Sequence, residues 1–244
     1  MAKKAAIPRT RARRTAGRIA TARPGGPRRA QRSAGAGDGT PPYHHGALRN
    51  ALLQAAERVL ERDGLAGLTL RAVAREAGVS HAAPTHHFGD LTGLVSELAA
   101  IGFRQFNATM DAARATGNAG PEKSMAAAKA YVEYAQAHPG MYGLMFRTER
   151  LDMSRRSLSE AAHASFAGLA AAVGASRHEH ISEEALSLEQ AAAIARAWSL
   201  VHGFTMLLLD GRLADILRRL PQGTSVETLL EAMLKATLGR QAGS

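Results

Sequence analysis

The sequence contains no cysteine among its 244 residues. Disulfide bonds and thiolate metal sites are therefore excluded, and a reducing compartment is the simplest setting. Aromatic residues make up only 5% of the chain, and no segment alternates apolar and polar residues as a half-buried strand does. The apolar fraction of 45% is still large enough for a core, and its many alanines and leucines favour helices. We therefore predict an all-α protein.

The sequence also has no long apolar run without charge. The segment that comes nearest to such a run is Ala191–Leu209, but it contains Arg196 and His202. A helix that crosses a membrane needs about 20 consecutive apolar residues. We therefore predict a buried helix here, and no membrane partner.

Acidic residues are almost absent from the first 42 residues. This segment holds eleven Lys or Arg against one acid, Asp38, which gives 11 − 1 = +10, whereas the rest of the chain holds 20 of each sign and is neutral. It also has almost no large apolar residues and no regular periodicity, so we predict a disordered basic tail over residues 1–42. Its role stays open between a non-specific tether to DNA phosphates and a solvated extension. A mitochondrial transit peptide, which is also rich in arginine, is a third alternative.

Helical periodicity begins after Pro41-Pro42. Apolar residues at helical spacing predict a first helix over residues 46–63, and Gly64 can end it in the left-handed conformation. Farther along, Asp90 can cap a longer helix that continues to about Ala113. The segment between these two predicted helices gives the strongest indication of the function of the chain.

Two short helices, Leu70–Ala77 and His81–Phe88, are predicted in that interval. Thr69 and Ser80 are their expected N-caps, and Gly78 supplies the turn between them. This spacing is typical of a helix-turn-helix, whose second helix enters the major groove of DNA. We therefore predict an N-terminal three-helix, helix-turn-helix DNA-binding head.

A larger helical region is expected beyond the linker at residues 117–121. Apolar residues recur there at helical spacing, and neither strands nor internal repeats are indicated. The expected helices lie near residues 122–138, 157–173, 183–210 and 225–238.

The head carries a longer set of motifs than the helix-turn-helix alone. Over residues 52–94 they follow one another as Leu52–Leu60, Gly64-Leu65, Leu68-Thr69-Leu70, Val73-Ala74, Ala77-Gly78-Val79-Ser80, His87-Phe88 and Leu94. Together they resemble the TetR family of bacterial transcriptional regulators. The C-terminal part resembles one TetR subgroup, through His138-Pro139-Gly140-Met141-Tyr142 and the element Trp198…His202-Gly203.

The resemblance implies a homodimer that binds a palindromic DNA operator and represses transcription until a small apolar effector releases it. Such a regulator is not an enzyme and works in the bacterial cytoplasm, at the nucleoid. The chain would then divide into the basic tail (1–42), the DNA-binding head (43–104) and a ligand-binding and dimerisation body (105–240). Dimerisation would use the last two long helices, Glu189–Asp210 and Ser225–Leu238, in a four-helix bundle with the partner's copies.

In a helix-turn-helix, the N-terminal part of the second helix contacts base edges. Histidine can donate to or accept from purines, and alanine methyl groups can touch the thymine methyl. Hydroxyl groups and free backbone amides at helix N-termini can bind phosphate. The predicted DNA-binding residues are therefore Thr69, Ser80, His81, Ala82, Ala83, Thr85, His86 and His87.

Three positions depart from the TetR pattern. Pro84 lies where leucine or isoleucine is commoner, and we expect an irregular start of the helix there. Thr85 replaces a phosphate-binding tyrosine, and Leu91 replaces a lysine. The head also contains six arginines and six acidic residues, so its charge is balanced. We therefore expect the basic tail to supply affinity for DNA that the head lacks.

In the body, five side chains are candidates for lining an apolar effector pocket that contains one polar group. Trp198 and His202 fall on nearly one helical face, together with Thr205. The alternative is that the candidates are ordinary core residues, with His202 hydrogen-bonded to a neighbouring helix. The five candidates are Met145, Phe146, Trp198, His202 and Met206.

No metal or other cofactor is expected. The adjacent residues His86 and His87 point about 100° apart on a helix, which is poor geometry for chelation. The run His178-Glu179-His180 falls in an expected loop and is predicted to be solvated. Two other classes stay open, a helical enzyme and an architectural protein that compacts DNA through its tail, although no nucleophile–base pair or metal-ligand spacing supports the enzyme.

Overall fold

The structure is a computed structural model, which describes residues 43–116, 121–182 and 184–238. In these ranges the chain forms ten α-helices, one short 3₁₀ helix and no strand, so the all-α prediction is confirmed. The predicted basic tail lies outside the described residues, and so does most of the predicted linker at residues 117–121.

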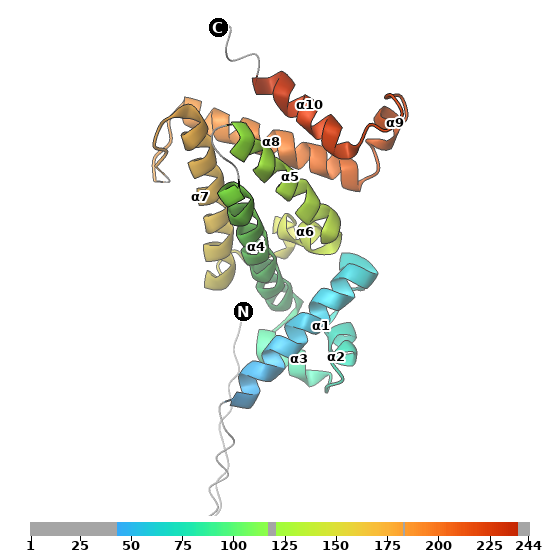
Figure 1. Cartoon of the computed structure of the whole chain (residues 1–244). Coiled ribbons are helices and arrows are strands. Elements are labelled where there is room, and N and C mark those ends of the chain that lie inside the picture. Colours follow the sequence, from blue (N-terminus) through green and yellow to red (C-terminus); the bar gives the residue numbers. More distant parts are fainter. Residues whose placement is uncertain (1–42, 117–120, 183, 239–244) are drawn as a thin grey trace, which may run out of the picture. The chain divides into compact units, whose positions relative to one another are not determined.

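The first three helices form a small layered unit (Figure 1). They are α1 (Tyr43–Gly67), α2 (Leu70–Glu76) and α3 (Ala82–Phe88), and α1 packs across the other two. Gly64 interrupts α1 with φ of 68°, close to the predicted end of the first helix at residue 63. The left-handed conformation costs glycine little, and it lets the chain change direction before α2.

The core of this unit comes from the apolar stripe expected along α1. Leu52, Val59 and Leu60 are fully buried, and so are Val73 on α2 and Leu94 on the next helix. Because residues three and four apart share one face of a helix, this spacing alone places the α1 side chains against α2 and α3.

The long helix α4 (Leu91–Thr116) leaves the head and continues into the body. The Asp90 carboxylate caps it as predicted, because its Oδ1 accepts the Gly93 amide at 2.7 Å. The helix continues unbroken through residue 104, the expected end of the head. Buried apolar residues along its whole length, from Leu94 to Met110, join the core of the head to that of the body.

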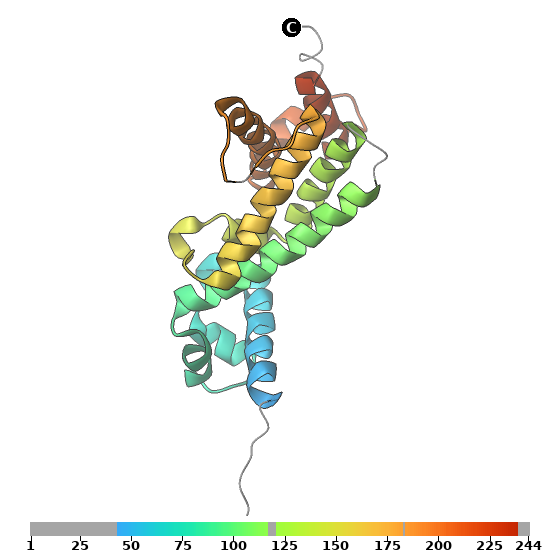
Figure 2. The ribbon, with the colours of Figure 1, turned by 90° about the vertical axis from the view of Figure 1, so that its left-hand side faces the viewer.

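The body packs around α4, with α7 running alongside it (Figure 2). The helix expected near 122–138 matches α5 (Pro121–Ala137), which ends before Pro139 because that residue lacks the amide hydrogen that would continue the helix. The seven-residue α6 and the four-residue α9 were not predicted, since such short helices show little periodicity. The body helices are α5 (Pro121–Ala137), α6 (Pro139–Met145), η1 (Thr148–Arg150, a 3₁₀ helix), α7 (Arg156–Arg177), α8 (Leu188–Leu209), α9 (Ala214–Leu217) and α10 (Val226–Leu238).

Two expectations for α8 need correction. The helix begins at Leu188 rather than near residue 183, because Ser187 and Gln190 form a capping box that fixes its start. We also expected a buried helix, but Trp198, Met206 and Leu207 are 43%, 37% and 44% exposed in the single chain. In the described part of the chain, α8 is the one helix whose length and composition would suffice to cross a membrane, which by itself is weak evidence.

Candidate functional site

The turn between α2 and α3 has the geometry that the sequence indicated. Thr69 Oγ1 accepts the Ala72 amide at 3.1 Å and caps α2. Gly78 adopts φ of 67°, and the next amide, of Val79, returns to the Ala74 carbonyl at 3.0 Å. Val73 and Ala74 are fully buried, so that α2 supports α3 from beneath.

The start of α3 differs from the prediction that Ser80 caps it. The N-cap is His81, with no side-chain cap, and the first helical residue is Ala82. Pro84 explains the shift, because it has no amide hydrogen to donate to the Ser80 carbonyl four residues earlier. The first regular helical bond is therefore displaced by one residue, and the Ser80 carbonyl instead accepts the Ala83 amide at 3.1 Å.

Seven of the eight predicted DNA-binding residues lie on α3 or in the two positions before it, whereas Thr69 is the N-cap of α2. Pro84 and Phe88 are buried and anchor the helix, whereas Ala83 and His87 are half-buried. The rings of His86 and His87 are 5.4 Å apart and nearly perpendicular. Thr69, Ser80, His81, Ala82, Thr85 and His86 are exposed.

Two arginines of the head connect helices within it. Arg58 Nε and Arg62 Nη1, both on α1, each lie 2.9 Å from a carboxylate oxygen of Glu76 on α2. Hydrogen bonds from Arg58 and Arg62 hold the pKa of Glu76 below its usual value. This pairing was missed from the sequence, although the spacing of four residues places both arginines on one face of α1.

A carboxylate of α1 also binds the body. Glu61 accepts the backbone amides of Gly140 and Met141 through its two oxygens, at 3.0 Å each. These amides belong to the first turn of α6, where helical amides have no partner within the helix. No local pattern indicates this interaction, because 79 residues separate Glu61 from Gly140.

Three polar side chains, from α5, α6 and α8, lie within hydrogen-bonding distance of one another. His202 Nδ1 lies 2.7 Å from the Tyr142 hydroxyl and 3.0 Å from the Tyr131 hydroxyl, and the two hydroxyls are 3.1 Å apart. Burial raises the pKa of Tyr131 to about 12, also raises that of Tyr142, and lowers that of His202. Because burial lowers the pKa of His202, the neutral imidazole is favoured, and its Nδ1 shares hydrogen bonds with the two phenol hydroxyls.

The five candidate pocket residues are only partly brought together. Phe146 lies 4.7 Å from the His202 ring and 6.3 Å from that of Trp198, measured between centroids. Met206 lies one turn farther along α8 and is exposed. Met145, however, is buried against Gly102 and the Tyr134 hydroxyl, in the core around α4. Tyr131 and Tyr142, the hydrogen-bonding partners of His202, were not predicted from the sequence.

Two surface cavities of the body are lined by residues other than these five candidates. One, of 270 Å³, is lined by α5 and the first turns of α10, and the other, of 550 Å³, by α7 and residues 178–181. Among the described residues, no three His, Asp or Glu side chains are grouped so that they could hold a metal ion.

A capped helix, a glycine turn and an exposed second helix define the helix-turn-helix class of DNA-binding proteins. Residues 52–98 match the family described as bacterial regulatory proteins of the tetR family, and residues 124–236 match the tetracyclin repressor-like C-terminal domain. The chain therefore belongs to the TetR family of transcriptional regulators, which bind DNA. No curated protein matches it significantly.

Solved structures with the same fold cover most of the chain. A Rhodococcus sp. RHA1 protein of unknown function is 33% identical, with a TM-score of 0.65 over 82% of this chain and 97% of its own. A tetR-family regulatory protein from Rhodococcus RHA1 is 16% identical, with a TM-score of 0.53 over 79% and 95% of the two chains. The regulator FadR from Bacillus subtilis, solved in complex with stearoyl-CoA, is 14% identical, with a TM-score of 0.55 over 76% and 95%.

Proposed function

We propose that this protein is a homodimeric repressor that leaves a palindromic DNA operator when a small apolar effector binds its body. The main support for the proposal is the composition of the exposed face of α3. Its exposed side chains are those that can contact bases, whereas Pro84 and Phe88 hold the helix on the core. Residues 43–104 act as the DNA-binding head and residues 105–240 as the effector and dimerisation body, in the bacterial cytoplasm at the nucleoid.

The side chains of α3 are suited to recognise DNA bases through only a few contacts. His81 and His86 offer ring nitrogens to purine edges, and the methyl groups of Ala82 and Ala83 fit beside a thymine methyl. The phosphate candidates are Thr69 at the start of α2 and Ser80, Thr85 and His87 on or just before α3. Because Arg58 and Arg62 are paired with Glu76, these two arginines offer little free positive charge to DNA.

The exposed face of α8 supports the homodimer. Ala195, Ser199 and Gly203 form a seam of small residues along it, and Met206 continues the seam with an exposed apolar side chain. Small residues let two helices approach closely, and an apolar face left in water is expected to be covered by a partner. With α10 beside it, this face suits a four-helix bundle between two copies.

The cluster around His202 supports the effector site. We propose that Nδ1 accepts a hydrogen bond from a tyrosine hydroxyl, so that Nε2 carries the hydrogen that His202 donates to a bound molecule. Phe146 and Trp198 flank the ring, and Met206 lies one turn away. An apolar effector with one hydrogen-bond acceptor fits this surrounding.

Selection of bound sequences from a random DNA pool tests the proposed function. We expect a palindrome whose half-sites are centred about 34–36 Å apart, or a multiple of that distance. Repeating the selection with a panel of apolar compounds should identify one that abolishes enrichment. Enrichment of unrelated sequences without symmetry would contradict the proposal and favour DNA compaction instead.

The single tryptophan gives a direct test of the effector site. Compounds that release DNA should change the fluorescence of Trp198 at the same concentrations. Replacing His202 by phenylalanine should weaken their binding about tenfold, the usual consequence of losing one buried hydrogen bond. Release of DNA without any change of Trp198 fluorescence would place the effector elsewhere.

Deletion of residues 1–40 tests whether the basic tail tethers DNA. If its arginines neutralise phosphates, the slope of log K against log salt should become shallower, by about 0.9 for each phosphate that the tail neutralises. The intact chain is the control, and the selected palindrome is the probe. An unchanged slope would show that the tail does not contact DNA.

A further inference from the structure

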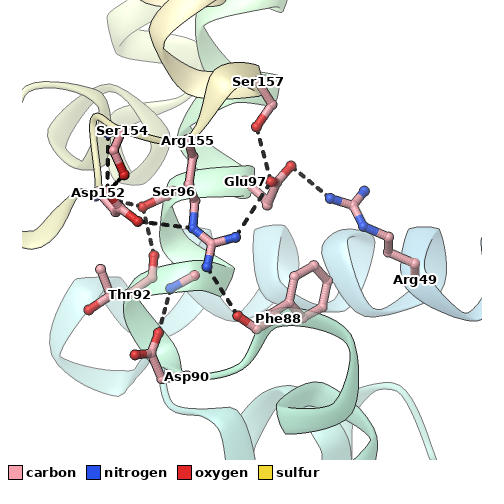
Figure 3. Close-up of polar contacts among 11 residues, drawn as sticks. Arg49, Phe88, Asp90, Thr92, Ser96, Glu97, Asp152, Ser154, Arg155 and Ser157 are labelled. Carbon is pink, nitrogen blue, oxygen red and sulfur yellow. Dashed lines mark hydrogen bonds and ion pairs between the residues drawn. The ribbon is translucent and has the colours of Figure 1, made fainter.

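One arginine of the body contacts the end of the recognition helix α3 (Figure 3). Arg155 is the N-cap of α7, and its Nη2 lies 3.4 Å from the carbonyl oxygen of Phe88, the last residue of α3. The peptide that ends the recognition helix is thus held by a side chain from more than sixty residues farther along the sequence.

Glu97 connects this arginine to the rest of the head. Its carboxylate lies 3.8 Å from Arg155 Nη1 and 2.7 Å from Arg49 Nη2, and it accepts the Ser157 hydroxyl at 3.0 Å. Only 14% of the Glu97 side chain is exposed, so these interactions are less screened than those of surface pairs. One carboxylate on α4 therefore joins α1 to the first turn of α7.

The fit around the Phe88 carbonyl is close. A Cβ atom on Gly93 would lie 2.0 Å from that oxygen and 2.6 Å from Arg155 Nη2, so a residue with a side chain cannot occupy this position without displacement. On the other side, the Arg49 guanidinium lies 5.4 Å from the centre of the Phe88 ring, which is within cation–π distance. The end of α3 is therefore held from two directions.

The segment before α7 is fixed to α4 as well. The Asp152 amide donates to the buried Ser96 hydroxyl at 2.8 Å, and the Asp152 carboxylate lies 3.5 Å from Arg155 Nε. Arg155 thus approaches α3 from a segment whose backbone is itself bound to α4. Its own contacts with Glu97, Phe88 and Asp152 are 3.4 to 3.8 Å long, so a small displacement of α7 would break them.

We infer that Arg155 is a positioning residue for DNA recognition, which fixes the orientation of α3 relative to the body. This inference rests on the proposed function, since in a dimer on a palindrome the bodies join the two heads. The orientation of each head then sets the separation between the two recognition helices, and hence the half-site spacing that the dimer accepts. Arg155 acts through α3 and does not itself contact bases.

The test compares Arg155→Ala with Arg156→Ala in the full-length protein. Arg156 is the matched control, because it is the adjacent residue, is 90% exposed and pairs with Glu160 on its own helix. Each variant is offered a DNA pool in which palindromes of the wild-type half-site carry spacers of different lengths. Amide hydrogen exchange of residues 82–93 is measured in parallel without DNA.

We expect Arg155→Ala to select the same half-site sequence as wild type but to accept several spacer lengths. It should bind DNA with the wild-type spacer length about tenfold more weakly. Amides of residues 82–93 should exchange faster than in Arg156→Ala, which should behave as wild type. Arg155→Lys should restore part of the spacer preference, because an ammonium group can pair with Glu97 but lacks the fork that also reaches the Phe88 carbonyl.

Two results would overturn the inference. One is an unchanged spacer preference in Arg155→Ala, and the other is an equal loss of affinity at all spacers together with a lower melting temperature, which would mark a purely structural residue. If the wild-type chain enriches no palindrome, the proposed function fails separately. The hydrogen-exchange comparison then still decides whether Arg155 positions α3.

Discussion

Two of the side chains that connect the head to the body bind the ends of short helices. Glu61 on α1 accepts two amides from the start of α6, and Arg155 on α7 binds the end of α3. Each contact satisfies backbone groups that a short helix leaves without partners at its ends. Because α4 alone joins the two parts covalently, these two residues limit how the head can turn about it.

For the first of these residues, we expect Glu61→Ala to lower the free energy of unfolding by about 1 kcal/mol, the usual loss for a helix cap. Glu61→Gln should lose less, because its one carbonyl oxygen can still accept one of the two amides. Urea denaturation measures both variants. Glu160→Ala is the control, since its exposed pair with Arg156 contributes little. Equal losses in Glu61→Ala and Glu160→Ala would refute the capping role.

His202 is the residue whose protonation should matter most for the body. Burial lowers its pKa, so the folded protein resists taking up a proton that the unfolded chain accepts near pH 6.5. The unfolded state then binds more protons, and the stability of the folded state falls as the pH drops below about 6.5. Above that pH both states are neutral at this position.

We therefore expect wild type to lose more stability between pH 8 and pH 5.5 than His202→Gln does. Chemical denaturation at the two pH values measures the difference. His180→Gln, a change at an exposed histidine, is the control and should keep the wild-type dependence. The hypothesis of a neutral imidazole bound to two phenols fails if His202→Gln keeps that dependence too.

Among the helices, backbone chemistry decides where each one begins and ends. Gly64 interrupts α1, Pro84 delays the start of α3, and Pro139 separates α6 from α5. In each case one residue either permits a conformation that others resist or lacks a required hydrogen-bond donor. Apolar periodicity alone placed these boundaries only approximately.

The same Gly→Ala substitution at two glycines of α1 should affect stability differently. Gly64→Ala should destabilise the protein by about 1 kcal/mol or more, because alanine resists a φ of 68°. Gly46→Ala should be neutral or stabilising, since Gly46 lies in helical conformation with nothing within 4 Å of an added Cβ. Thermal unfolding of both variants measures the contrast. The same sign of effect at the two positions would contradict this explanation of the break in α1.

For the molecule as a whole, the exposed apolar face of α8 is the main feature that a single chain leaves unexplained. A helix with Trp198, Met206 and Leu207 in contact with water is unusual in a soluble monomer. The proposed dimer would cover this face and place two heads on one DNA. Assembly and DNA affinity are then coupled, because only the dimer reads both half-sites.

We expect Ala195→Arg to convert the dimer into monomers, because a charged side chain would be buried in the seam between two copies of α8. The operator affinity should fall together with the dimer. Ala164→Arg is the control, since Ala164 is also an exposed alanine, on α7. Sedimentation equilibrium measures the assembly. A wild-type chain that is already monomeric, or an Ala195→Arg variant that stays dimeric, would contradict the proposed interface.

Most of the DNA-binding head follows from local signals in the sequence. The stripe of α1, the Thr69 and Asp90 caps and the Gly78 turn depend on residues within four positions of each other, so they could be predicted with their physical roles. The all-α class followed from the same periodicity, and the TetR motifs indicated the family. The predicted start of α3 was wrong by one residue, because Pro84 has no amide hydrogen to donate to the Ser80 carbonyl.

The interactions that join these parts depend on tertiary packing. Glu61 lies 79 residues from Gly140, Arg155 lies 67 from Phe88 and His202 lies 60 from Tyr142, and no local spacing encodes such pairs. The same holds for Met145, which was predicted from the sequence as a pocket residue but is buried in the core. Helices arise from interactions along the chain, whereas the contacts that orient the head and surround His202 depend on which helices come to lie side by side.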